Sequence, residues 1–132
     1  MWPFSSADAR RALIVEDDVG MRTMLGVCLG GIGWQVTETS NGLEGMAAAL
    51  ERPPKLVLLD LAMPLMDGSD VLVQLRANPK TAKAVIIIVT ANGALDDIDR
   101  LLSLGANDYL TKPFEFSQLK DKVARYFPPE AA

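Results

Sequence analysis

Polar residues with reactive or metal-binding side chains stand directly after four apolar runs of the chain. Glu16 and Asp17 follow the first of these runs, and Asp60, Thr90 and Lys112 stand at the ends of the other three. Three carboxylates brought to one place repel one another unless a cation lies among them. Oxygen ligands without histidine suit Mg²⁺, for which Mn²⁺ could substitute. A cation, a lysine and a hydroxyl around one carboxylate would form a site for placing a phosphoryl group on it, here on Asp60.

Each of these signals is weak when it is taken alone. A carboxylate before a helix, such as Asp18, is more often an N-cap than a metal ligand. Asp60 could cap the next element, a threonine at a strand end is commonly structural, and Lys112 with Pro113 could form an ordinary loop. Because these residues follow different apolar runs, their joint appearance favours a functional site over unrelated local features.

The elements that must position these residues alternate along the chain. Strand-like runs are expected at 12–15, 34–38, 55–60, 84–90 and 108–111, and amphipathic helices at about 21–32, 43–50, 71–77, 95–102 and 116–127. Five strand–helix repeats predict an α/β fold: a doubly wound (βα)5 sandwich of flavodoxin-like type, with five parallel strands in the order 2-1-3-4-5. Because parallel strands end at one edge of their sheet, the polar residues should converge there.

The composition excludes several classes of function. A net charge of −4 without a basic stripe argues against direct binding of nucleic acid. No apolar run is long enough for insertion into a membrane. The chain has no histidine, which excludes histidine-based zinc sites and Ser–His or Cys–His nucleophile pairs. Cys28 is the only cysteine, so no intramolecular disulfide can form, and a reducing, cytoplasmic location is expected.

The length of 132 residues fits one domain. We expect a short N-terminal leader at 1–9, the domain itself at 10–128, and a C-terminal tail at 129–132. The leader contains Trp2 and Phe4, which could pack on the domain surface or on a partner.

Four segments together resemble the receiver domain of two-component response regulators, the family that includes the chemotaxis regulator CheY. They are residues 13–18 (LIVEDD), 59–68 (LDLAMPLMDG), 89–91 (VTA) and 105–114 (GANDYLTKPF). The resemblance covers residues 11 to about 127 and is specific because all four segments occur with the family's spacing. It implies a phosphorylation-activated signalling domain, in which self-phosphorylation and slow autodephosphorylation would be the only enzymatic activities.

The resemblance also implies roles for individual residues. Asp60 would accept a phosphoryl group, and Mg²⁺ would be held by Glu16, Asp17, Asp60 and the backbone carbonyl of Ala62. Lys112 would pair with phosphoryl oxygens, and the hydroxyl of Thr90 would donate to one of them.

Further positions are implied to affect switching and rate. Tyr109 matches the aromatic residue that turns inward as the Thr90 hydroxyl moves toward the phosphoryl group. Pro113 is implied to follow a cis peptide bond. Ala62 and Asn92 match variable positions that modulate phosphorylation rates, and Ala62 has no polar group to orient an attacking water.

The implied partners are a histidine kinase or histidine phosphotransfer protein as donor, and a downstream protein that binds the face formed by the last helix and the fifth strand. A stand-alone receiver is the leading expectation, and a fragment of a larger regulator or hybrid kinase is the alternative. A phosphatase of the haloacid-dehalogenase type is disfavoured because Ala62 stands where that family needs an acid. A nucleotide-binding Rossmann unit is disfavoured because acids, not glycines, follow the first strand.

Overall fold

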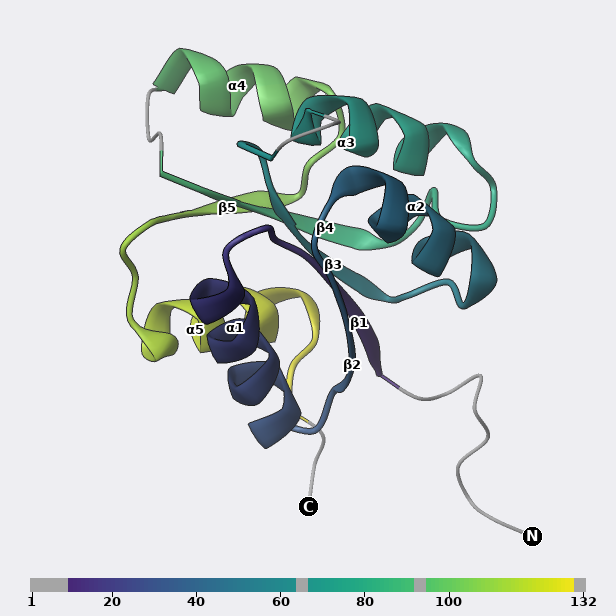
Figure 1. Cartoon of the computed structure of the whole chain (residues 1–132). Helices are drawn as coiled ribbons and strands as arrows, with labels where there is room; N and C mark the ends of the chain where they lie inside the picture. The colour runs from purple at the N-terminus through teal and green to yellow at the C-terminus, as the bar shows by residue number, and fades with distance from the viewer. Residues whose placement is uncertain (1–9, 64–66, 92–94, 130–132) are drawn as a thin grey trace, which may run out of the picture.

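A five-stranded parallel sheet forms the centre of the computed structural model, which describes residues 10–63, 67–91 and 95–129. The strands are β1 (Arg11–Val15), β2 (Gln35–Thr39), β3 (Leu56–Asp60), β4 (Val85–Thr90) and β5 (Asp108–Thr111). Their order is β2-β1-β3-β4-β5, and every neighbouring pair is parallel. The predicted doubly wound topology is therefore confirmed (Figure 1).

Helices cover both faces of this sheet. They are α1 (Val19–Gly31), α2 (Gly42–Glu51), α3 (Gly68–Ala77), α4 (Leu95–Ser103) and α5 (Phe116–Tyr126). Figure 1 shows α1 and α5 on one face and α2, α3 and α4 on the other. Among the described residues, no helix is long and apolar enough to cross a membrane. The leader expected at 1–9 and most of the tail lie outside the described residues.

The alternation of side chains along each strand divides the core in two. In β3, Val57 and Leu59 belong to the cluster under α2, α3 and α4, whereas Leu56 and Leu58 belong to the cluster under α1 and α5. Successive side chains of a strand point to opposite faces, so a strand covered on both faces must be apolar throughout. This requirement explains why the run before Asp60 contains no polar residue.

Helix boundaries follow from local capping. The expected first helix starts earlier than the apolar pattern indicates, at Val19, because the side chain of Asp18 accepts a hydrogen bond from the backbone N–H of Met21 at 2.7 Å. Asn41 caps α2 in the same way by accepting from Glu44 at 2.9 Å. The second strand starts one residue later than expected, because the backbone N–H of Trp34 donates to the carbonyl of Leu29 near the end of α1 at 3.1 Å. Capping thus sets these starts within two residues of the sequence expectation.

Arg76 joins three segments of the chain through its guanidinium group. Nε donates to the carbonyl of Gly105 at 2.8 Å, and Nη1 donates to the carbonyls of Ala82 and Ala84 at 2.9 and 2.6 Å. Nη2 donates to Oδ1 of Asn107 at 2.7 Å. The guanidinium therefore ties α3 to the turn before β4 and to the loop before β5.

Replacing Arg76 by methionine should destabilise the fold, since it leaves these acceptors without a donor while preserving most of the apolar stem. We expect the free energy of unfolding to fall by about 2–4 kcal/mol, because each lost partner of a buried polar group costs about 1–3 kcal/mol. Urea unfolding measures the change. Arg100→Met, on the exposed side of α4, is the matched control and should cost well under about 1 kcal/mol; equal losses would contradict the role of Arg76.

Candidate functional site

Strand register brings the predicted site residues to one edge of the sheet. Val15 is level with Leu59, so Glu16 and Asp60 leave β1 and β3 side by side. Asp60 is level with Val89, and Thr90 is level with Thr111. Thr90 and Lys112 thus lie at the same carboxyl edge as the acids. Thr90 is one position beyond the level of Asp60, and Lys112, directly after β5, is two positions beyond it. The predicted convergence of the four strand ends is confirmed.

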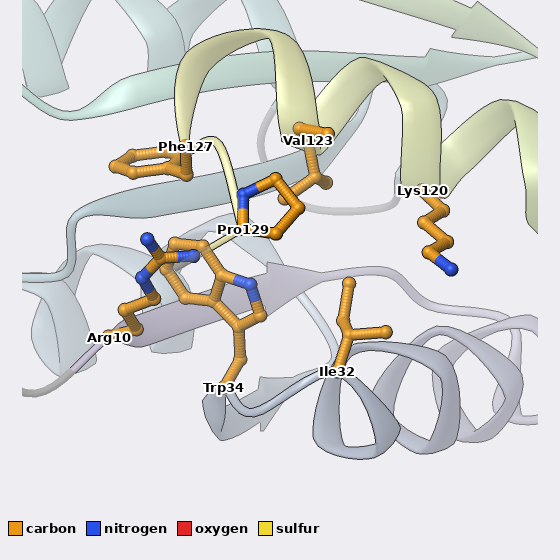
Figure 2. A pocket seen from close by; sticks show the side chains of 8 residues that line it. Arg10, Ile32, Trp34, Lys120, Val123, Phe127 and Pro129 are labelled. Atoms are coloured by element: carbon orange, nitrogen blue, oxygen red, sulfur yellow. The ribbon is translucent and has the colours of Figure 1, made fainter. Parts of the chain in front are cut away.

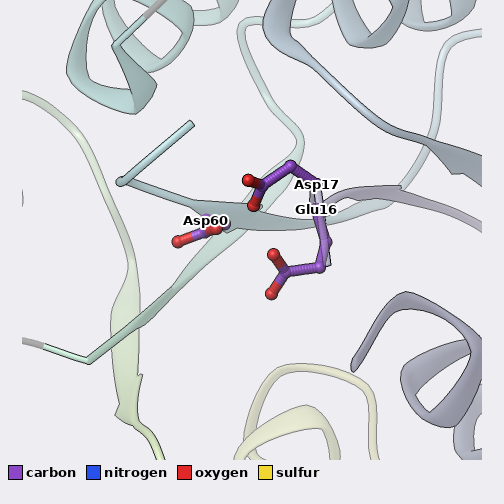
Figure 3. Close-up of side chains that lie close together, drawn as sticks. All are labelled: Glu16, Asp17 and Asp60. Carbon is purple, nitrogen blue, oxygen red and sulfur yellow. The ribbon is translucent and has the colours of Figure 1, made fainter. Parts of the chain in front are cut away.

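Glu16, Asp17 and Asp60 form an acidic cluster (Figure 3). Each offers one carboxylate oxygen, and these oxygens all lie within 4.8 Å of one another. Glu16 is only 1% exposed and Asp60 only 4%, whereas Asp17 is exposed. Two of the three carboxylates are therefore buried, which is costly unless a counter-charge or a proton accompanies them.

The ammonium group of Lys112 supplies part of this counter-charge. Its Nζ lies 2.6 Å from Oε1 of Glu16 and 3.8 Å from Oδ2 of Asp60. The sequence indicated a lysine facing an anion at Asp60; in the structure the hydrogen bond of Lys112 goes to Glu16, and Asp60 lies farther away. The Lys112–Pro113 peptide is cis, the conformation that the resemblance implies.

The pKa of the Asp60 carboxyl group lies well above its ordinary value, close to neutral pH. This pKa is raised from 3.8 to about 7, chiefly by burial and in addition by the neighbouring carboxyl group of Glu16. Lys112 and the backbone N–H of Ala62, which donates to Oδ1 of Asp60 at 3.2 Å, partly oppose this rise. A cation bound in the cluster would favour the charged form of Asp60.

The donor set of the acidic cluster fits a hard divalent cation. All three side chains offer oxygen, and the spacing of these oxygens allows one ion to contact them together. Magnesium is held in proteins by one or two carboxylates with water and phosphate oxygens, so a cluster open on the side of Asp17 suits it.

Arg22 braces the loop that presents Glu16 and Asp17, a role that the sequence reasoning missed. Its Nη1 donates to the backbone carbonyls of Glu16 and Asp17 at 2.9 and 3.3 Å. The backbone N–H of Asp18 donates to Oε2 of Glu16 at 3.2 Å. An arginine one helical turn after the acids was the available signal.

The loop after Asp60 packs against the start of α3. Asp67 caps this helix by accepting from the backbone N–H of Ser69 at 2.9 Å. A Cβ atom on Gly68 would lie 2.5 Å from the carbonyl oxygen of Asp60 and 2.6 Å from the Cα of Leu61, so only glycine allows this approach. Ala62 is exposed beside Asp60. Asn92, the other predicted rate-modulating residue, lies outside the described residues.

The predicted switch residues lie on the adjacent strands β4 and β5. Thr90 is buried at the end of β4, and its carbonyl accepts from the backbone N–H of Lys112 at 2.8 Å. Tyr109 is half-buried on β5 and packs against the core under α2, α3 and α4. The ammonium of Lys122 on α5 lies 4.9 Å from the centre of the Tyr109 ring, a cation–π contact.

Replacing Asp60 by asparagine should stabilise the metal-free protein above neutral pH. A carboxyl group whose pKa is higher in the folded than in the unfolded chain lowers the free energy of unfolding as pH rises from 3.8 through about 7. Asp60→Asn removes this loss. In the presence of a chelator, we expect the variant to gain on the order of 1–2 kcal/mol at about pH 8 and little at about pH 4.

Urea unfolding at the two pH values measures this difference. Asp121→Asn is the matched control, because Asp121 is exposed on α5, away from the acidic cluster. A gain for Asp60→Asn that is the same at both pH values would contradict a buried, titrating carboxyl group.

Comparisons with known proteins assign the chain to a family. The profile of the response regulator receiver domain matches residues 12–124. A probable chemotaxis protein CheY of Rhizobium etli is 40% identical over 124 residues, which cover 93% of this chain and 96% of that protein. The sporulation initiation phosphotransferase F of Bacillus subtilis is 35% identical over 89% of this chain and 94% of that protein.

A solved structure agrees with these relatives. The receiver domain of a sensor histidine kinase from Pseudomonas aeruginosa, with a magnesium ion coordinated in its active-site cleft, superposes with a TM-score of 0.82 at 30% identity. The match covers 89% of this chain and 97% of that chain. The sequence, the sheet order and the clustered strand ends therefore lead to one conclusion: the chain belongs to the response regulator receiver domains of two-component signal transduction, with a CheY-like fold.

Proposed function

We propose that this receiver domain is a phosphorylation switch in which Asp60 accepts the phosphoryl group. The observation that carries the proposal is the placement of Asp60: a buried carboxylate at the end of the central strand, with Glu16, Asp17 and the ammonium group of Lys112 beside it. A buried carboxylate with a strongly perturbed pKa beside charged partners is typical of functional sites. A purely structural role, such as accepting the hydrogen bond from the backbone N–H of Ala62, would not require two further acids beside Asp60.

The transfer forms a bond between a carboxylate oxygen of Asp60 and phosphorus. The bond between phosphorus and the donor imidazole nitrogen breaks, and the nitrogen keeps the electron pair. Lys112, released from Glu16, would pair with a phosphoryl oxygen, and the Thr90 hydroxyl would donate to another. Mg²⁺ bound by Glu16, Asp17, Asp60 and the carbonyl of Ala62 would neutralise charge on the transferring group.

The deprotonated form of Asp60 is the nucleophile in this scheme. Because its pKa is raised to about 7 without a cation, only part of the population is ready to react near neutral pH. The residues that favour the charged form of Asp60 therefore also favour transfer. Chemistry of this kind is limited to self-phosphorylation and slow loss of the phosphoryl group; the domain itself is a signalling module and not a conventional enzyme.

Thr90 and Tyr109 would transmit the change at Asp60 to the protein surface. Movement of the Thr90 hydroxyl toward the phosphoryl group frees space into which Tyr109 turns, which alters the surface of α4, β5 and α5. We propose this surface for the downstream protein, and a histidine kinase or histidine phosphotransfer protein as donor. The stand-alone organisation and the cytoplasmic location stay predictions.

Acetyl phosphate with Mg²⁺ should phosphorylate the chain once, at Asp60. Intact-mass measurement should show one phosphate-sized adduct on the wild-type protein and none on Asp60→Asn. Asp67→Asn is the matched control, because Asp67 caps α3 in the loop that follows Asp60 yet lies outside the acidic cluster, and it should keep the adduct. Absence of an adduct on the wild type, or its survival in Asp60→Asn, would contradict the assignment.

Ala62→Asn should shorten the lifetime of the phosphorylated state. Ala62 is exposed beside Asp60, and its methyl group cannot orient a water molecule for attack on phosphorus. An amide at this position could do so, and we expect about a tenfold faster loss, below the 10²–10⁴-fold typical of full acid–base catalysis. Decay of the adduct after removal of the phosphodonor measures the rate. Ala62→Val, which adds bulk without a polar group, should not accelerate decay.

A further inference from the structure

An apolar hollow of about 220 Å³ lies between the end of α1 and α5, at the sheet edge opposite the acidic cluster. Figure 2 shows its walls, which include Ile32, Trp34, Val123 and Phe127. The rings of Trp34 and Phe127 meet edge to face, with their centres 4.9 Å apart. These side chains make the wall both aromatic and fixed in geometry.

Arg10 holds the start of the described chain at the rim of this hollow. Its guanidinium carbon lies 5.6 Å from the centre of the Trp34 ring and 6.0 Å from that of Phe127. Its Nη2 donates to the carbonyl of Pro128 at 3.0 Å. The N-terminal segment 1–9 is therefore joined to the domain at the edge of the hollow.

The size of the hollow indicates which kind of group could occupy it. Pockets for drug-sized ligands measure about 300–1,000 Å³, so this hollow is too small for one but suits a single aromatic side chain. The leader at 1–9 carries two such side chains, Trp2 and Phe4, whereas the tail at 130–132 (EAA) carries none. Phe4 precedes Arg10 by six residues, which reach about 20 Å when extended and leave ample length to turn back.

We propose that the segment Trp2-Pro3-Phe4 of the same chain docks in this hollow and seats one aromatic ring against Trp34 and Phe127. Pro3 restricts the backbone on both sides of itself, so less conformational entropy is lost when the segment is ordered. The residues between, Ser5, Ser6 and Asp8, favour turns that reverse the chain direction. The leader would thus fasten the start of β1 to α5.

This docking site is independent of phosphoryl transfer at Asp60, which lies at the other edge of the sheet. It does involve α5, whose Lys120, Val123 and Ala124 line the hollow and which we assign to the surface for the downstream protein. A docked leader would therefore form part of the border of that surface.

A double-mutant cycle on the full chain tests the docking. Trp2→Ser/Phe4→Ser removes the proposed occupant, and Ala124→Gln fills the hollow from α5. The leader variant should raise the equilibrium constant for unfolding about tenfold, because ring burial is offset in large part by ordering of the leader. The same leader change should have no effect in the Ala124→Gln background.

Matched controls keep the interpretation specific. Ser5→Ala/Ser6→Ala changes the same segment without removing a ring, and Ala47→Gln places the same side chain on the exposed face of α2. The first should leave the equilibrium constant for unfolding nearly unchanged, and the second should leave the effect of the leader variant intact. An effect of the leader variant that persists in Ala124→Gln would overturn the assignment of the hollow.

Methyl NMR gives a direct readout that needs no change in the hollow. Signals of Ile32, Val123 and Ala124 should shift when Trp2 and Phe4 are replaced, while those of Leu72, in the opposite core cluster, should not. Unchanged signals together with an unchanged equilibrium constant for unfolding would overturn the proposal. So would shifts that grow with protein concentration alongside a doubled mass in solution, since the leader would then dock on a second copy.

Discussion

Burial of the Asp60 carboxylate at the end of the central strand is the constraint on which the rest of the structure depends. A second buried carboxylate, that of Glu16, lies beside it, and one lysine serves both. Like charges at this distance cannot both be ionised without a large cost unless a cation joins them. The fold therefore carries a local instability that a proton, a cation or a phosphoryl group with its counter-ions can relieve. Such instability is retained where it serves function.

Packing in the rest of the fold offsets the free-energy cost of burying these two carboxylates. The strand β3 is buried along its whole length and sends alternate side chains into two separate clusters under the two helical layers. Because both faces are covered, its polar atoms can reach solvent only at the strand ends. Gly68 then lets the start of α3 approach the backbone of Asp60 and Leu61 closely. The position of the carboxylate is thus a consequence of the packing on both faces.

Features set by the ends of apolar runs and by local capping were predictable, whereas individual side-chain contacts between distant segments were not. Apolar runs fixed the strand ends and hence the meeting of Asp60 with Glu16, and Asp18 was correctly weighed as an N-cap. The donation from Lys112 to Glu16 depends on the distance from the end of β5 to the end of β1, with β3 and β4 between them, which no spacing in the sequence reveals. The same holds for Arg76, whose acceptors lie up to 31 residues away and include no acid that would have indicated an ion pair.

The connection from β5 to α5 explains how a change at the site can reach a distant surface. Residues 112–115 alone join the two elements, and they begin with Lys112 at the acidic cluster. At the start of β5, the buried Asp108 accepts from Lys122 at 2.8 Å and from Arg125 at 3.1 Å on α5. Although burial alone would raise it, the pKa of Asp108 is lowered by the hydrogen bonds from Lys122, from the backbone N–H of Tyr109 and from the hydroxyl of Tyr126, so the carboxylate stays charged.

Lys122 also contacts the face of the Tyr109 ring. Its ammonium is therefore shared between a fixed carboxylate and the aromatic side chain proposed to turn during switching. Any turn of Tyr109 must change this contact while Asp108 keeps Lys122 in place. In the proposed switch, the rearrangement would therefore be confined to the ring and the side chains around it on α4, β5 and α5, as expected of a binding surface that changes its contacts without loss of the underlying fold.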